Sequence, residues 1–174
     1  MTNMKKIQII LGLLVFVMAS SCIKNEQAVF DDQTVVEWDA ASWNANAAGL
    51  TYPILTRVPG YGRAATSSDP LLSRTLPGIK KFRVNLVGGQ RPTATRVYYT
   101  VYQGTTAQED VHYKKLSGEV TIPANSSFGE MEIEILDPGA STPATRDLNL
   151  LLTGGEQGVT SSVNYRILAL RIAQ

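Results

Sequence analysis

The sequence predicts an all-β protein, a sandwich of two packed antiparallel sheets with seven to eight strands. Apolar residues recur at every second position in several short runs, which is the period of a strand with one buried face. Turn-forming residues separate the runs, and no amphipathic helix of ten residues or more is found. Strands with one polar face each bury their apolar faces when two sheets pack together.

The first predicted strands have the weakest patterns. Val35–Trp38 and Tyr52–Val58 contain β-branched and aromatic residues without strict alternation. Lys81–Leu86 alternates cleanly and places its three apolar residues on one face. The later strands are predicted at Arg96–Tyr102, Glu119–Ile122, Glu130–Ile135, Leu148–Leu152 and Tyr165–Ile172.

Glu130–Ile135 has the sharpest alternation, with three glutamates opposite three apolar residues. The spacing of the glutamates overlaps that of the carboxylate pairs in glycoside hydrolases. A row of acids on a solvated strand is more simply a soluble face or a protected edge. His112, the only histidine, has no nucleophile motif beside it. We therefore predict that the protein is not an enzyme.

The segment Pro59–Gly78 interrupts the rhythm, because it has turn formers and no period. It contains Tyr61, Arg63 and Arg74, and Arg57 lies two residues before it. A loop of this length is often functional or mobile. Two interpretations stay open: a binding loop or a disordered surface loop.

The N-terminus has the layout of a secretory signal peptide. Lys5 and Lys6 precede an apolar run of about a dozen residues, a length below the roughly 20 that span a bilayer. The small residues Ala19, Ser20 and Ser21 follow. A permanent transmembrane anchor is the competing interpretation.

Ala19-Ser20-Ser21-Cys22 resembles the lipobox of bacterial lipoproteins, in which the cysteine becomes the lipidated first residue of the mature chain. The alternative is a free cysteine within a signal peptide. Lys24 and Glu26 resemble the signal that exports lipoproteins of Bacteroidota to the outer face of the outer membrane, although an ordinary polar tether would look similar. These features predict a signal peptide at 1–21, a lipidated tether at 22–30 and one β-sandwich domain at 31–174.

The charge balance argues against nucleic acid as a partner. Residues 1–21 contain two lysines and no acid, so the 16 basic side chains fall to 14 against 15 acidic ones in the mature chain. A formal charge near −1 does not favour a polyanionic partner.

The segments "VYYTVYQGTTAQEDVHY", "GEVTIPANSSFGEMEIEILDPG" and "RDLNLLLTGG" follow one another in an order that resembles the Calx-beta domain, in the form found in many lipoproteins of Bacteroidota. The resemblance covers roughly Phe82 to Ile172 and implies an immunoglobulin-like sandwich. Members of that family can bind calcium, and the matching positions here are Asp110, Asp137 and Asp147. This chain has Asp137-Pro138-Gly139 where other members carry paired aspartates, so we predict no cofactor, with calcium bound by these aspartates as the alternative.

Four aromatic residues are the predicted ligand-binding candidates: Trp43, Tyr61, Tyr98 and Tyr102. Trp43 lies in a polar context, where Asp39, Asn44 and Asn46 could hydrogen-bond to sugar hydroxyls, whereas Trp38 continues a strand pattern and is predicted in the core. Tyr98 and Tyr102 lie opposite the apolar face of their strand. Tyrosine suits recognition surfaces because it is large, stiff and amphipathic.

The resulting hypothesis is a non-catalytic lipoprotein, anchored in the outer membrane through Cys22 and facing the cell exterior. It binds or presents an extracellular ligand, and the resemblance to Bacteroidota lipoproteins indicates a polysaccharide. The alternative is a structural or adhesion module that contacts another envelope protein.

Overall fold

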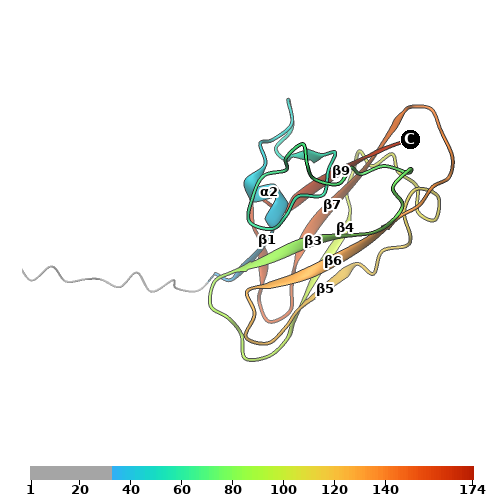
Figure 1. The fold of residues 1–174 in the computed structure, drawn as a ribbon. Coiled ribbons are helices and arrows are strands. Elements are labelled where there is room, and N and C mark those ends of the chain that lie inside the picture. Colours follow the sequence, from blue (N-terminus) through green and yellow to red (C-terminus); the bar gives the residue numbers. More distant parts are fainter. Residues whose placement is uncertain (1–32) are drawn as a thin grey trace, which may run out of the picture. The chain divides into compact units, whose positions relative to one another are not determined.

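The computed structural model describes residues 33–174, which form two β-sheets packed face to face (Figure 1). Sheet 1 has the strand order β6-β3-β1-β8, and sheet 2 has the order β2-β9-β7-β4-β5. The strands are β1 (Val35–Trp38), β2 (Ile54–Leu55), β3 (Gly78–Val87), β4 (Thr95–Val101), β5 (Glu119–Ile122), β6 (Phe128–Ile135), β7 (Thr145–Gly155), β8 (Thr160–Ser161) and β9 (Ile167–Ala173). The predicted all-β sandwich is confirmed.

Sheet 1 is built around the antiparallel pairing of β3 with β6, in which Phe82 lies opposite Met131. The alternation predicted for Glu130–Ile135 is confirmed, because the apolar residues are buried and the glutamates are exposed. β6 is an edge strand of this sheet. Its exposed glutamates disfavour pairing with another chain, as expected for a protected edge.

Sheet 2 is centred on β7, which pairs antiparallel with β4 on one side and with β9 on the other. Residues Leu148, Leu150 and Leu152 are fully buried, as the sequence predicts. Val101, which has the same parity along β4 as the buried Val97 and Tyr99, is exposed at the end of that strand. The inward faces of the two sheets form one hydrophobic core.

Trp38 belongs to this core and is fully buried, which confirms its predicted position. Its ring meets Tyr99 of sheet 2 edge to face, with the ring centroids 6.0 Å apart. Its indole Nε1–H donates a hydrogen bond of 3.1 Å to the carbonyl oxygen of Arg166. A buried tryptophan needs such a partner for its polar atom.

The prediction of purely antiparallel sheets is wrong at two places. β8 pairs parallel with β1, and β2 pairs parallel with β9. Both of these strands are two residues long, so neither carries an alternating pattern that would indicate its pairing partner or direction. Of the strand predicted at Tyr52–Val58, only Ile54–Leu55 forms. One isolated bridge joins Arg57 to Leu71.

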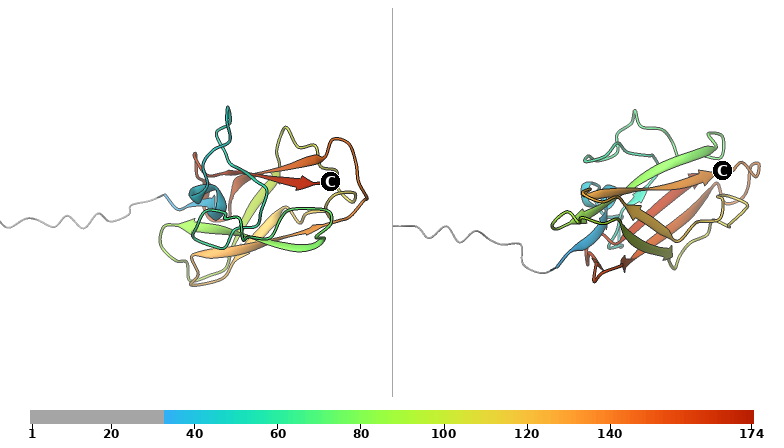
Figure 2. Two further views of the ribbon diagram at one scale, coloured as in Figure 1. Left: turned by 45° about the horizontal axis from the view of Figure 1, so that its top comes forward. Right: turned by 90° about the horizontal axis from the view of Figure 1, so that it is seen from below.

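A short helix, α2 (Asp39–Trp43), follows β1 near the end of the sandwich that lies away from the C-terminus (Figure 2). Ala40 and Ala41 are buried, and their small side chains allow the helix to lie close to the sheets. The carboxylate of Asp39 accepts hydrogen bonds from the backbone N–H of Gly62 (2.8 Å) and from the amide of Asn85 (2.9 Å). Asp39 therefore joins the helix to β3 and to the 59–78 segment. Within residues 33–174, no helix has the length and hydrophobicity to cross a membrane.

Candidate ligand-binding site

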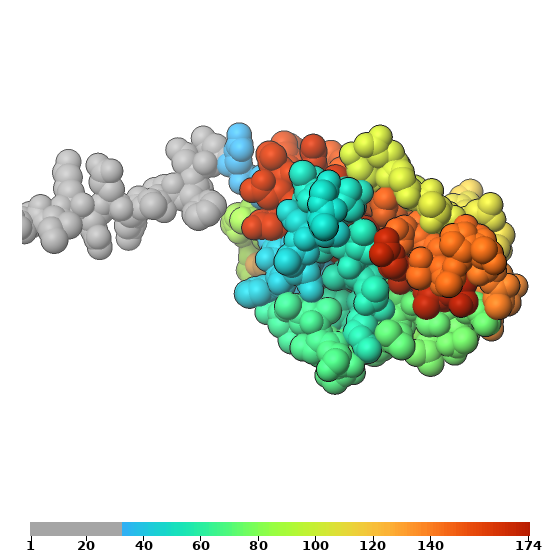
Figure 3. Space-filling model, turned by 90° about the horizontal axis from the view of Figure 1, so that it is seen from above, coloured from blue at the N-terminus to red at the C-terminus, as the bar shows by residue number. Residues whose placement is uncertain are grey.

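A pocket of about 520 Å³ lies where the turn after α2 meets the turn between β8 and β9. Figure 3 shows these two stretches of chain, in cyan and red, lying against each other on the surface. The pocket is lined by Asn46, Thr51, Val163, Asn164, Tyr165 and Arg166.

Backbone hydrogen bonds fix both walls of the pocket. The backbone N–H of Trp38 donates to the carbonyl of Tyr165 (3.0 Å), and the indole of Trp38 donates to the carbonyl of Arg166. On the other wall, the N–H of Ala47 donates to the carbonyl of Tyr52 (3.0 Å). The core tryptophan thus positions one wall directly, so the pocket is formed without a ligand.

The polar side chains of the lining have no protein partners. Within residues 33–174, no hydrogen bond is formed by the side chains of Asn46, Thr51, Asn164, Tyr165 or Arg166. Together they offer two amides, two hydroxyls and a guanidinium, which provide many donors and several acceptors. These groups can therefore exchange their water for a ligand without breaking any contact of the fold.

Trp43 ends α2 and is 53% exposed, which confirms its prediction as an exposed aromatic. It precedes Asn46 by three residues, so their Cα atoms lie within about 11 Å of each other by chain length alone. Tyr165, in the lining itself, is 37% exposed. Tyr165 therefore supplies an aromatic ring in the lining, and Trp43 is an exposed aromatic close to Asn46 along the chain.

Asn44 fixes the backbone directly after Trp43. Its Nδ2 donates to the carbonyl of Ala40 (2.7 Å), and its Oδ1 accepts from the N–H of Ala65 (3.0 Å). The first bond ends the helix, and the second attaches the 59–78 segment to it. Asp39 and Asn44, two of the predicted sugar-binding groups, are thus engaged within the protein, while Asn46 is free and lines the pocket.

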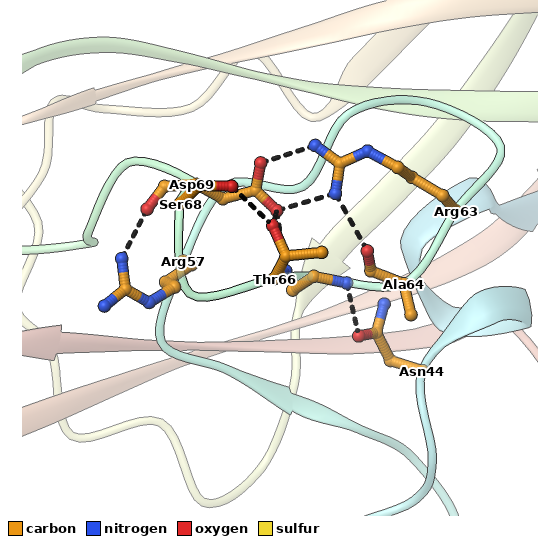
Figure 4. A network of polar contacts seen from close by, with 8 residues as sticks. Asn44, Arg57, Arg63, Ala64, Thr66, Ser68 and Asp69 are labelled. Carbon is orange, nitrogen blue, oxygen red and sulfur yellow. Dashed lines mark hydrogen bonds and ion pairs between the residues drawn. The ribbon is translucent and has the colours of Figure 1, made fainter.

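The 59–78 segment is closed by the buried carboxylate of Asp69 (Figure 4). Arg63 donates to both of its oxygens, and the backbone N–H of Thr66 donates to Oδ2 at 2.7 Å. These bonds hold the pKa of Asp69 well below its ordinary value, Arg63 having the largest effect. The segment is therefore organised by its own polar contacts, in contrast to the interpretation as a disordered loop.

Tyr61 does not line the pocket. It lies above the outer face of sheet 1. Its hydroxyl donates to Glu130 (2.7 Å), and the guanidinium of Arg83 lies 5.6 Å from its ring and 3.7 Å from that of Phe128. Partial burial and the nearby Glu130 carboxylate raise the pKa of Tyr61 to about 12. Because these groups satisfy one another, they have fewer free atoms for a ligand.

Tyr98 and Tyr102 lie on β4 or directly after it, in sheet 2, and Tyr98 faces outward. The Tyr98 hydroxyl is 3.5 Å from Glu156, and Tyr102 meets Tyr52 edge to face at 6.3 Å. The four aromatic candidates thus do not form one site. Nothing in the sequence pattern marks Thr51 or 163–164, and the residues 163–166 lie beside Asn46 only in the folded chain.

The three aspartates proposed from the Calx-beta resemblance do not form a common site. Asp137 pairs with Arg74 (3.0 Å) and accepts from the N–H of Gly139, while Asp147 forms a two-point ion pair with Arg171 (2.8 Å for both bonds). Asp110 is exposed in a turn with a positive φ of 60°. Within the described part of the chain, no three His, Cys, Asp or Glu side chains form a group that could hold a metal ion.

His112 is buried in a turn, where its Nδ1 accepts a hydrogen bond from the backbone N–H of Gln108 (2.9 Å). Burial, followed by the charge of Arg146, lowers the pKa of His112. The exposed glutamates of β6 are balanced by Lys81, whose ammonium lies 3.3 Å from Glu130 and 3.1 Å from Glu132. Cys22 and the rest of the predicted signal and tether lie outside the described residues.

No family model matches this sequence, and the search of curated proteins finds no match. Among solved structures, the apo Calx CBD1 domain is similar, with 21% identity, a TM-score of 0.48 and coverage of 58% of this chain and 85% of that one. A Bacteroides ovatus protein of unknown function has 13% identity and a TM-score of 0.52, with coverage of 82% of this chain and 52% of that one.

A candidate carbohydrate-binding protein from Bacteroides ovatus ATCC 8483 is also similar, with 13% identity and a TM-score of 0.41. The match covers 56% of this chain and 32% of that one. This chain therefore spans about a third of the candidate carbohydrate-binding protein and about half of the Bacteroides ovatus protein of unknown function. At these identities the similarity is one of fold, which by itself does not establish a function.

Proposed function

We propose that this chain is a non-catalytic, lipid-anchored protein of the outer membrane, exposed to the cell exterior, whose β-sandwich binds a glycan. The pocket between residues 46–51 and 163–166 is the binding site. The main support is the set of five polar side chains that line this pocket without protein partners.

Sugars match the chemistry of this pocket. Their hydroxyls can both donate and accept, as can the amides of Asn46 and Asn164. Their apolar ring faces can stack on exposed aromatic side chains such as Trp43 and Tyr165. A preformed pocket with a few convergent polar groups is the usual form of a small-ligand site.

The composition of the lining favours binding over catalysis. Glycoside hydrolysis uses a pair of carboxylates, and the six lining residues include no Asp or Glu. The membrane part of the proposal rests on the lipobox resemblance at Cys22. Several acyl chains would hold the protein firmly, because each buried methylene adds about 0.8 kcal/mol of membrane affinity.

The test uses protein made from residue 23 onward, since residues 33–174 contain both sheets and the described core. Native gels containing plant, host or microbial polysaccharides report binding as retardation of the protein band. We expect one polysaccharide to retard the wild type, and Trp43→Ala and Asn46→Ala to reduce the effect. Tyr98→Ala, a matched aromatic change on another surface, should bind normally.

Retardation that Trp43→Ala and Asn46→Ala leave unchanged would place the site elsewhere. Retardation by no polysaccharide would favour the alternative, a structural module that contacts another envelope protein. One observation supports that alternative: a groove of about 410 Å³ beside β5 and β6, both edge strands, with the partly exposed Phe128 in its lining. A pull-down from envelope extracts would then test it.

A further inference from the structure

Resting on the proposed function, we infer that the glycan is acidic and that Arg166 selects it by binding a uronic acid carboxylate. Arg166 is the only charged residue among the six that line the pocket. Within residues 33–174, no carboxylate lies within 4.0 Å of its guanidinium. The pocket lining therefore carries one positive charge and no negative charge.

Every other arginine of the chain has a side-chain hydrogen bond, ion pair or aromatic contact within residues 33–174, and Arg166 has none of these. Four pair with carboxylates, three donate to backbone or amide oxygens, and one stacks on aromatic rings. The four ion-paired arginines are Arg63, Arg74, Arg96 and Arg171. The three that donate to backbone or amide oxygens are Arg57, Arg91 and Arg146, and the one that stacks is Arg83. The fold thus uses the other guanidiniums for its own contacts and leaves that of Arg166 for a ligand.

The backbone of Arg166 is held while its side chain is free. Its carbonyl oxygen accepts two hydrogen bonds, one from the indole of Trp38 (3.1 Å) and one from the N–H of Leu152 (2.8 Å). Both donors belong to fully buried core residues. The base of the side chain is thereby fixed at the pocket, which lowers the cost of binding because less of the site has to be ordered.

A guanidinium recognises a carboxylate by two parallel hydrogen bonds, and such charge-assisted pairs are stronger than neutral ones. The remaining lining groups are amides and hydroxyls, which suit the hydroxyls around the carboxylate of a uronic acid. A neutral sugar would use these groups but would leave the positive charge without a partner. The composition of the lining therefore favours an acidic polysaccharide.

The experiment compares four uronate polysaccharides, namely polygalacturonate, alginate, glucuronoxylan and hyaluronan, each with its carboxyl-reduced neutral form. Binding by wild type, Arg166→Gln and the charge-matched control Lys115→Gln is measured in affinity gels. We expect at least one acidic polymer to bind, and its reduced form to bind about tenfold more weakly, as the loss of a charge-assisted hydrogen bond predicts. Arg166→Gln should weaken binding of the acidic polymer to a similar degree, and Lys115→Gln should not.

Each other outcome has a distinct meaning. Equal binding of the acidic and reduced forms, or binding only of neutral polymers in the wider panel, would overturn the inference about Arg166 and leave the proposed function standing. Equal weakening by Arg166→Gln and Lys115→Gln would also overturn it, because general charge attraction would then explain the binding. Failure of every polysaccharide, acidic or neutral, would overturn the proposed function itself.

Discussion

Two nitrogens of the Arg63 guanidinium donate hydrogen bonds to the carboxylate of Asp69, and the Nη1–Oδ2 distance is 2.8 Å. The side chain of Asp69 is 8% exposed, and that of Arg63 is 44% exposed. The same carboxylate accepts from Thr66, while Arg57 donates to the Asp69 carbonyl. One aspartate thus closes the segment that lies against α2.

This arrangement predicts a pH dependence. Because the pKa of Asp69 is lowered in the fold, its contribution to stability is complete above its ordinary value of 3.8 and is lost as the pH falls toward its folded value. Asp69→Asn should lower the thermal midpoint at pH 7, and the difference from wild type should narrow progressively below about pH 4. Calorimetry at several pH values measures this. A difference that stays constant down to pH 2 would contradict the prediction.

His112 predicts a second, separate pH effect. Its pKa lies below the ordinary value of 6.5 in the fold, so the unfolded chain takes up the proton first as the pH falls. Its contribution is present above pH 6.5 and is lost below it. His112→Asn keeps an acceptor for the Gln108 N–H and should flatten the stability profile between pH 5 and 7. Because the chain has a single histidine, its NMR titration reports the pKa without ambiguity.

The core tryptophan should be costly to replace. Trp38→Phe removes the donor to the Arg166 carbonyl and leaves a void beside Tyr99, with an expected loss of about 2–4 kcal/mol in the free energy of unfolding. Trp43→Phe is the matched control, and because it is exposed its effect should be within about 0.5 kcal/mol. Urea unfolding compares the two. Similar losses for both variants would contradict the placement of these rings.

Gly129 lies where β6 approaches β5 closely. A Cβ atom at this position would be 2.6 Å from the carbonyl oxygen of Thr121, a backbone atom that cannot move easily. Gly129→Ala should therefore destabilise the protein by about 1–3 kcal/mol. Gly89→Ala, whose Cβ would meet nothing within 4 Å, should have little effect. Equal stability of the two variants would contradict the close approach.

The lipidation proposed at Cys22 predicts that membrane attachment depends on one thiol. Cys22→Ser should release the full-length protein from the outer-membrane fraction or leave its signal peptide uncleaved, because serine cannot form the thioether. Fractionation of cells, with mass spectrometry of the mature N-terminus, measures both. Protease treatment of intact cells tests whether the domain faces outward, and protection of the wild type would place it on the inner side.

Strands with strict alternation could be predicted from the sequence almost to the residue. Glu119–Ile122 has the predicted bounds, and β6 begins two residues before its prediction. In each case one face is buried, so the period of two is enforced by packing. The two-residue strand β8 could not be predicted, and β2 is only the short part of the predicted strand Tyr52–Val58 that forms, because both are held by backbone hydrogen bonds that any side chain allows.

The candidate site could be predicted only in part. Trp43 and Asn46 stand out in the sequence because they follow a strand pattern in a polar context. Their partners at 163–166 lie more than a hundred residues further along the chain and reach them through the sheet topology. Arg166 also has no local signal, since its importance depends on the absence of a nearby carboxylate, which is a property of the folded chain.

The position of β1 in sheet 1 has a mechanical consequence. This strand is the first of residues 33–174, so a pull on the N-terminal side reaches it before any other described element. Val35 and Val36 are paired on both sides, antiparallel with β3 and parallel with β8. A force along the strand therefore acts on the backbone hydrogen bonds to both neighbouring strands. Trp38, at the end of the strand, is fully buried in the core. An envelope protein held by its N-terminus under flow would resist peeling at the point where the force enters.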